Sequence, residues 1–141
     1  MVDLEHVGSL AVTGRPDRVR AALGALVLEL ATSSWADDVQ VTVAGDLAAV
    51  EDALASGRIR YQPAVARALH ELTTDLDGDL AALTAAALPD APAARTRRQV
   101  AATWTPRVLV LAGDLTDEQR RQVRELADRL ATGPRVAAAV V

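Results

Sequence analysis

The chain has 141 residues, a length that suits one domain with a hydrophobic core of its own. Its formal net charge of −4 offers no general electrostatic attraction to nucleic acid or to an anionic membrane, so we expect direct contact with neither. Cysteine is absent and all 15 Lys and Arg positions are arginine, which excludes disulfides, thiolate metal sites, the lysine of a phosphate-binding loop and a Schiff-base lysine.

The first predicted elements are a strand and a long helix joined by a glycine turn. The run "SLAVT" at Ser9–Thr13 is apolar enough for a strand, and Pro16 suits the first turn of a helix. Apolar residues then recur at helical spacing, namely Val19, Leu23, Leu26, Val27 and Leu30. Leu28 adds an apolar residue on another face of the helix. This pattern predicts a largely buried helix.

The next predicted elements are a second strand, a short helix and a third strand. The run "DVQVTVAG" at Asp38–Gly45 alternates as a half-buried strand does. Asp46 is placed to cap a helix over 47–54, which ends at Gly57. The short run "RIRYQ" at Arg58–Gln62 predicts a third strand.

Apolar residues spaced three and four apart predict a long helix in the middle of the chain. They are Val65, Leu69, Leu72, Leu76, Leu80 and Leu83. The pattern allows one helix or two helices joined near Asp77 and Gly78. We expect the Val65–Leu83 helix to cover the sheet; the alternative is a projecting arm through which two copies associate. The Pro-, Ala- and Arg-rich segment 88–103 is predicted to be a mobile connection.

The last predicted elements are a buried strand, a capped helix and a final strand. The run "PRVLVLAGD" at Pro106–Asp114 is apolar on successive residues, as a strand covered on both faces requires. Thr116 and Gln119 have the spacing of a capping box, and the helix that follows ends at Gly133. The apolar run at 135–141 predicts a last strand, and we expect the chain to belong to a longer protein that covers this edge.

The alternation of strands and helices predicts the fold. We expect one α/β domain over 1–141, a three-layer αβα sandwich whose mainly parallel sheet has about five strands, laid out as in P-loop NTPases or Rossmann folds. Ligands of such sheets gather at the carboxyl ends of the strands. In this chain those ends hold the turn at Gly14, Asp46 after the second strand and Asp114 after the fourth.

The sequence offers little for catalysis. Histidine occurs only at His6 and His70, too few for a zinc site, and no serine lies in a G-x-S-x-G elbow. We therefore expect no catalytic residues, no metal site and no cofactor.

The turn after Gly14 departs from a phosphate-binding loop. The pattern G-x-x-x-x-G-K-[ST] would place lysine and a hydroxyl where this chain has Arg20 and Ala21. Pro16 removes one N–H donor, and Asp17 puts a negative charge at the start of the helix, where it repels phosphate. We therefore expect the loop to be degenerate.

An alternative hypothesis keeps a ligand at this turn. Because a guanidinium binds phosphate bidentately, arginine can take the place of the missing lysine, and the chain would then bind a nucleotide or a small anion. The candidate ligand-binding residues are Gly14, Arg15, Arg18, Arg20, Asp46 and Asp114.

Three stretches resemble a known family: "VDLEHVGSLAVTG", "LVLELATSSWADDVQVTVAG" and "WTPRVLVLAG". They are similar to the cytoplasmic α/β region of large actinobacterial membrane-anchored proteins that carry LysM and bacterial-transcriptional-activator domains (BTAD). The similarity covers most of the chain and is weakest over 64–102. The order of elements is more distantly similar to FtsK/SpoIIIE-type P-loop ATPases. The closer resemblance implies a cytoplasmic, non-catalytic regulatory or scaffolding domain that contacts other domains of its parent protein or protein partners.

Overall fold

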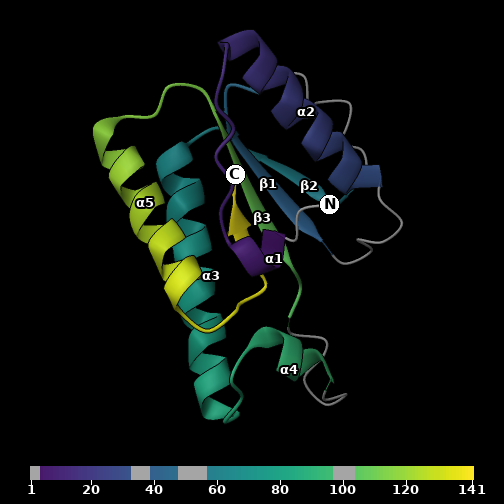
Figure 1. Ribbon diagram of the computed structural model, residues 1–141, viewed down its shortest axis with the longest axis vertical. Helices are drawn as coiled ribbons and strands as arrows, with labels where there is room; N and C mark the ends of the chain where they lie inside the picture. Colours follow the sequence, from purple (N-terminus) through teal and green to yellow (C-terminus); the bar gives the residue numbers. More distant parts are fainter. Residues whose placement is uncertain (1–3, 33–38, 48–56, 97–103) are drawn as a thin grey trace.

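Four parallel strands form the sheet of this domain. The computed structural model describes residues 4–32, 39–47, 57–96 and 104–141 (Figure 1). The strands are β1 (Gln40–Gly45), β2 (Ile59–Gln62), β3 (Arg107–Ala112) and β4 (Ala138–Val140). They lie in the order β2-β1-β3-β4, and every neighbouring pair is parallel.

Helices cover both faces of the sheet and complete three layers. α2 (Pro16–Thr32) packs on β1 and β3 from one side, whereas α3 (Val65–Ala85) and α5 (Asp117–Thr132) lie together on the other side (Figure 1). Two short helices, α1 (Leu4–Val7) and α4 (Ala91–Thr96), complete the described elements. This arrangement confirms the predicted α/β fold class. Among the described residues, no helix has the length and apolar character needed to cross a membrane.

Alternate residues of the strands build a separate core on each face of the sheet. Val41 and Val43 of β1 pair in register with Val108 and Val110 of β3, and all four belong to the core that α2 covers. On the opposite face, Leu109 packs in the core that α3 and α5 cover. Burial on both faces explains why β3 is apolar at successive positions.

The regularly spaced apolar residues of α3 belong to the core. Four of them are at most 6% exposed, namely Leu69, Leu72, Leu76 and Leu83. The helix therefore covers the sheet, and it runs through Gly78 without a break. Self-association through Val65–Leu83 stays a prediction, and it would have to use the solvent-facing side of the helix.

The strand predicted at Ser9–Thr13 does not form, so the sheet built by the described residues has four strands rather than about five. Ser9 makes an isolated bridge to Val140, and the Leu10 N–H donates to the Val140 carbonyl at 2.9 Å. Residues 11–13 make no bridge to any strand of the described chain. Apolar character favours a strand, but a strand also needs a partner along its length.

The prediction for α2 was partly wrong, whereas the predicted start of α5 is confirmed. α2 is not largely buried as predicted: Leu28 is 46% exposed, because a helix on the outside of a sheet packs through one stripe only. That stripe is Leu23, Val27 and Ala31. The capping box of α5 is confirmed, since Thr116 Oγ1 accepts from the Gln119 N–H at 3.2 Å and Gln119 Oε1 accepts from the Thr116 N–H at 2.8 Å.

The segment 88–103 contains structure that its composition did not predict. It holds α4, whose Ala91 and Ala94 are 0% exposed. Its mobility stays a prediction, and residues 97–103 lie outside the described residues, as does most of the helix predicted over 47–54.

Trp104 carries a buried donor without a partner. It is 2% exposed, and among the described residues no acceptor meets its indole Nε1–H. An unpaired buried donor costs about 1–3 kcal/mol, which offsets much of the packing lost when indole becomes phenyl. We expect Trp104→Phe to change the free energy of unfolding by less than about 1 kcal/mol and Trp104→Ala to lower it by about 3–5 kcal/mol. Urea denaturation measures the free energy of unfolding of both variants. Equal losses of stability in the two variants would contradict the interpretation that the indole N–H is unpaired.

Candidate functional site

The strand order places a cleft at the carboxyl ends of β1 and β3. β1 and β3 are neighbours in the sheet. The connection after β1 leads to β2 on one side of this pair, and the connection after β3 leads to β4 on the other side. Doubly wound sheets open a ligand crevice at such a junction. Here we find an open cleft of about 490 Å³ between the Gly14 turn, the start of α2, and the residues that follow β1 and β3.

Four of the six predicted ligand-binding residues line this carboxyl-edge cleft. They are Gly14, Arg20, Asp46 and Asp114. Arg15 and Arg18 are not among its lining residues, and Arg15 instead pairs with Asp17 at 3.3 Å on the exposed start of α2. The structure thus brings together residues from three separate segments, and their role in binding stays a prediction.

The two strand ends approach each other closely at the cleft. The Asp46 N–H donates to the Ala112 carbonyl at 2.8 Å. Gly45 has a φ of +91°, and a Cβ on it would lie 1.9 Å from the same carbonyl oxygen. A side chain at this position is therefore excluded both by its backbone conformation and by the lack of space.

The charged groups of the cleft largely neutralise one another. Arg20 pairs with Asp46 at 3.4 Å, and both side chains are more than half exposed. Asp114 adds a second carboxylate to the lining. An incoming phosphate would have to separate Arg20 from Asp46 and would meet the charge of Asp114. The cleft is therefore poorly suited to a polyphosphate.

The described residues contain no metal-binding cluster. No three His, Asp or Glu side chains among them are grouped to hold a metal ion. His6 lies on α1, and His70 lines a groove between α3 and α5, so neither histidine enters the carboxyl-edge cleft.

An apolar hollow of about 400 Å³ adjoins the cleft. The N-terminal segment, α2, α5 and the ends of β3 and β4 surround it. Its apolar lining includes Leu10, Val12, Val19, Leu111, Val123 and Val141. Val12, Val19 and Gly113 line both the hollow and the cleft, so the two spaces are adjacent. The sequence does not predict the hollow, because the hollow arises where the N-terminal segment leaves the sheet.

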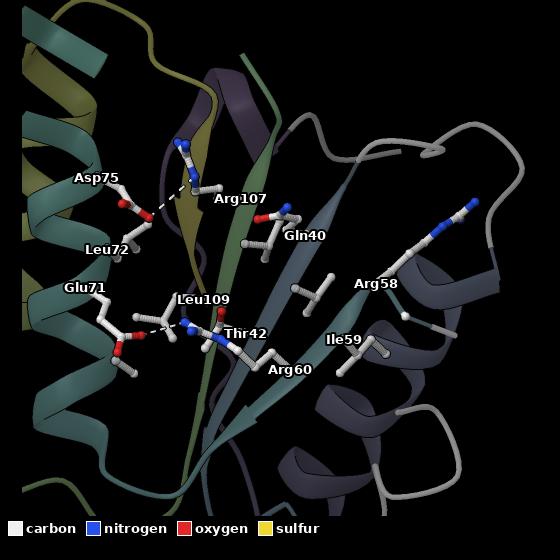
Figure 2. A pocket seen from close by; sticks show the side chains of 14 residues that line it. Gln40, Thr42, Arg58, Ile59, Arg60, Glu71, Leu72, Asp75, Arg107 and Leu109 are labelled. Atoms are coloured by element: carbon white, nitrogen blue, oxygen red, sulfur yellow. Dashed lines mark hydrogen bonds and ion pairs between the residues drawn. The ribbon is translucent and has the colours of Figure 1, made fainter. Parts of the chain in front are cut away.

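A polar groove of about 340 Å³ lies between α3 and the β2 side of the sheet (Figure 2). Figure 2 shows Arg60 reaching toward Glu71 and Arg107 reaching toward Asp75, each across the groove from sheet to helix. The Arg60–Glu71 pair measures 2.6 Å and the Arg107–Asp75 pair 3.5 Å. These ion pairs link α3 to the sheet, and we assign the groove a structural role.

The Glu71 carboxyl in this groove is expected to make the stability of the fold depend on pH. A hydrogen bond from Arg67 is the main cause that holds the pKa of Glu71 below its ordinary value; desolvation opposes it, and Arg60 supports it. A carboxyl whose pKa is lowered by folding adds stability above its unfolded pKa, and this contribution is lost as the pH falls through the folded pKa. We therefore expect wild type to exceed Glu71→Gln in urea midpoint near neutral pH, with the difference shrinking on acidification.

Titration of the Glu71 carboxyl by NMR tests the cause of this shift. In Arg67→Ala the pKa of Glu71 is expected to rise toward its ordinary value. The matched variant Arg121→Ala, which removes an arginine of α5 that pairs with Glu118, leaves it unchanged. The same pKa for Glu71 in Arg67→Ala and in wild type would refute the assignment.

The sequence matches no protein-family model, and it has no significant match among curated proteins or among solved structures. The cleft, the hollow and their contacts therefore carry the functional interpretation.

Proposed function

We propose that this chain is a non-catalytic regulatory domain that acts by binding protein partners or other domains of a larger protein. The observation that carries this proposal is the chemistry of the carboxyl-edge cleft. Its one lining guanidinium, Arg20, is paired with Asp46, and the described residues supply it with neither a histidine nor a metal-binding cluster. The position where such a sheet binds ligands is thus lined by an arginine that is already paired and by carboxylates.

The neighbouring hollow supports an interaction function. Apolar side chains from several elements surround a space that they do not fill. Unfilled apolar surface on a domain is typical of binding sites. The resemblance to the α/β region of membrane-anchored LysM and BTAD proteins agrees with this function, and membership of that family and a cytoplasmic location form part of the proposal.

A second candidate function is binding of a nucleotide or a small anion. The Gly14 turn and Arg20 favour it, because they lie at the junction where doubly wound sheets bind ligands. The ion pair between Arg20 and Asp46, together with the carboxylate of Asp114 in the lining, opposes it.

Binding measurements with two kinds of probe separate these functions. In the first arm, thermal unfolding is followed with ATP, GTP or inorganic phosphate, each with Mg²⁺. In the second, a random peptide library displayed on phage is selected against the folded chain, and recovered sequences are titrated as pure peptides. We expect the phosphates to leave the unfolding transition unchanged and several recovered peptides to bind in solution.

The outcome of the first arm is quantitative. A nucleotide present at a hundred times its Kd would add about 2.7 kcal/mol to the free energy of unfolding. Such a shift, lost in Arg20→Ala and kept in the matched variant Arg120→Ala, would establish the second candidate and contradict the first. Recovered peptides that fail to bind in solution would also contradict the proposed interaction function.

A further inference from the structure

α4 is attached to the rest of the domain by few contacts. Its two inward side chains, Ala91 and Ala94, are 0% exposed, but each contributes only a methyl group to the core. Among the described residues, one backbone hydrogen bond links α4 to the body of the domain, from the Ala91 N–H to the Arg135 carbonyl at 2.8 Å. Because small side chains bury little apolar surface, they hold α4 in place only weakly.

The remaining hydrogen bonds of α4 are local. The Asp90 carboxylate caps the helix by accepting from the Ala93 N–H at 2.8 Å, and the Asp90 carbonyl accepts from the Ala94 N–H at 3.2 Å. The Thr96 hydroxyl donates to the Ala93 carbonyl at 2.7 Å. Separation of α4 from the domain therefore requires none of these three bonds to break.

The joint between α3 and this segment is strained. Ala87 has a φ of +51°, and it is the one residue other than glycine with a positive φ among the described residues. The Leu88 N–H donates to the Leu83 carbonyl at 3.0 Å, and the Ala87 N–H donates to the Thr84 carbonyl at 3.1 Å. This pair of bonds forms a Schellman motif, in which glycine is the usual residue at the position of Ala87. The Cβ of alanine disfavours this conformation, so strain is relieved when Ala87 leaves it.

The cluster that α4 joins carries a second cost. Ala91, Ala94 and Trp104 belong to the same buried cluster, and Figure 1 shows α4 below the start of β3. The indole Nε1–H of Trp104 has no acceptor among the described residues. Water that reached this donor would satisfy it. The strain at Ala87 and the unpaired donor therefore both oppose the docked arrangement of α4.

We infer that the segment 88–96 is a reversible flap, which separates from the domain by rotation at Ala87 and admits solvent to Trp104. The inference goes beyond the proposed interaction function and does not depend on it. A domain responds to a partner through an element with two arrangements, because a partner that binds one of them better shifts the equilibrium. The flap provides such an element near the amino end of β3, whereas the carboxyl-edge cleft lies at the other end of the strand.

Native-state hydrogen exchange on the unmodified chain tests the flap. After correction for intrinsic rates, the Ala91 N–H and the Trp104 indole N–H are expected to exchange at least tenfold faster than the Val110 N–H in the middle of β3. Opening of a small segment exposes little surface, so we expect low concentrations of urea to leave the rates at Ala91 and Trp104 almost unchanged. Exchange of either proton at the rate and with the urea dependence of Val110 would overturn the inference.

Ala87→Gly tests the hinge. Glycine adopts the conformation of Ala87 without strain, so the docked arrangement is favoured and exchange at Ala91 is expected to slow a few-fold. The matched variant Ala82→Gly, at an exposed helical position of α3, is not expected to slow it. If exchange at Ala91 were no slower in Ala87→Gly than in wild type, the segment would not pivot at this residue.

A charge on the buried side of α4 is expected to hold the flap open. Ala94 is 0% exposed, so the carboxylate of Ala94→Glu cannot stay in the core without a partner. In the background Trp35→Phe, Trp104 is the only indole, and we expect Ala94→Glu to shift its emission to the red while a cooperative urea transition remains. The matched variant Thr96→Glu, at an exposed position of the same helix, keeps the emission of the background.

Two outcomes of this last experiment would contradict the flap. Loss of cooperative folding in Ala94→Glu would show that α4 is an integral part of the core. An unshifted emission in a folded Ala94→Glu variant would show that Trp104 stays covered when α4 is displaced.

Discussion

Gly45→Ala is expected to lower the free energy of unfolding by more than about 4 kcal/mol or to prevent folding. The new Cβ would lie 1.9 Å from the Ala112 carbonyl oxygen, at a residue whose φ is +91°. Relief of this contact would separate the ends of β1 and β3 and break the hydrogen bond from the Asp46 N–H to Ala112. Urea denaturation, with circular dichroism as a check on folding, measures the loss.

Gly57→Ala is the matched control for this substitution. Gly57 also has a positive φ, +72°, but no atom lies within 4 Å of a Cβ placed there. It therefore reports the conformational penalty alone, which we expect to be about 1–2 kcal/mol. Equal losses of stability in Gly45→Ala and Gly57→Ala would show that the close approach of Gly45 to Ala112 does not contribute to the cost of the substitution.

Asp79→Ala is expected to lower the free energy of unfolding by about 2–3 kcal/mol, a fall in Tm of roughly 5–10 °C. Asp79 accepts a hydrogen bond from Arg107 Nη1 at 2.7 Å, and its side chain is only 12% exposed. Its removal leaves the guanidinium of Arg107, 24% exposed, with only the longer contact to Asp75. The cost comes from a largely buried cation that has lost its nearer partner.

Two further variants serve as controls for Asp79→Ala. The Asp75 side chain is 51% exposed, so Asp75→Ala is expected to cost less than about 1 kcal/mol. The double variant Arg107→Leu with Asp79→Leu removes both charges and is expected to recover part of the stability that Asp79→Ala loses. Equal losses in Asp75→Ala and Asp79→Ala would show that burial does not distinguish the two carboxylates.

Local patterns predicted those elements whose stability depends on local contacts. The capping box at Thr116 and the spacing of Leu69, Leu72 and Leu76 are properties of a helix and its one buried face, and both are confirmed. The predicted strand at Ser9–Thr13 is wrong because a strand needs a partner along its whole length, and a local pattern does not contain the position of that partner. α4 was missed because its Pro- and Ala-rich sequence resembles a loop.

The location of the cleft was predictable, but its surroundings were not. The rule that ligands gather at the carboxyl ends of parallel strands correctly grouped Gly14, Asp46 and Asp114. Arg15 and Arg18 do not line the cleft, because Arg15 precedes α2 and pairs with Asp17, whereas Arg18 lies two residues before Arg20 and therefore on another side of the helix. The hollow depends on the separation of a segment from the sheet, which only the assembled fold shows.

The bridge between Ser9 and Val140 joins segments from opposite ends of the described chain. Contacts so distant in sequence form only after a large loop has closed, and that closure costs chain entropy before any contact energy is gained. Non-local parallel pairing of this kind is intrinsically slow compared with the formation of local contacts. We therefore expect Ser9 and β4 to dock late during refolding, so that the N-terminal segment closes one side of the hollow as one of the last events.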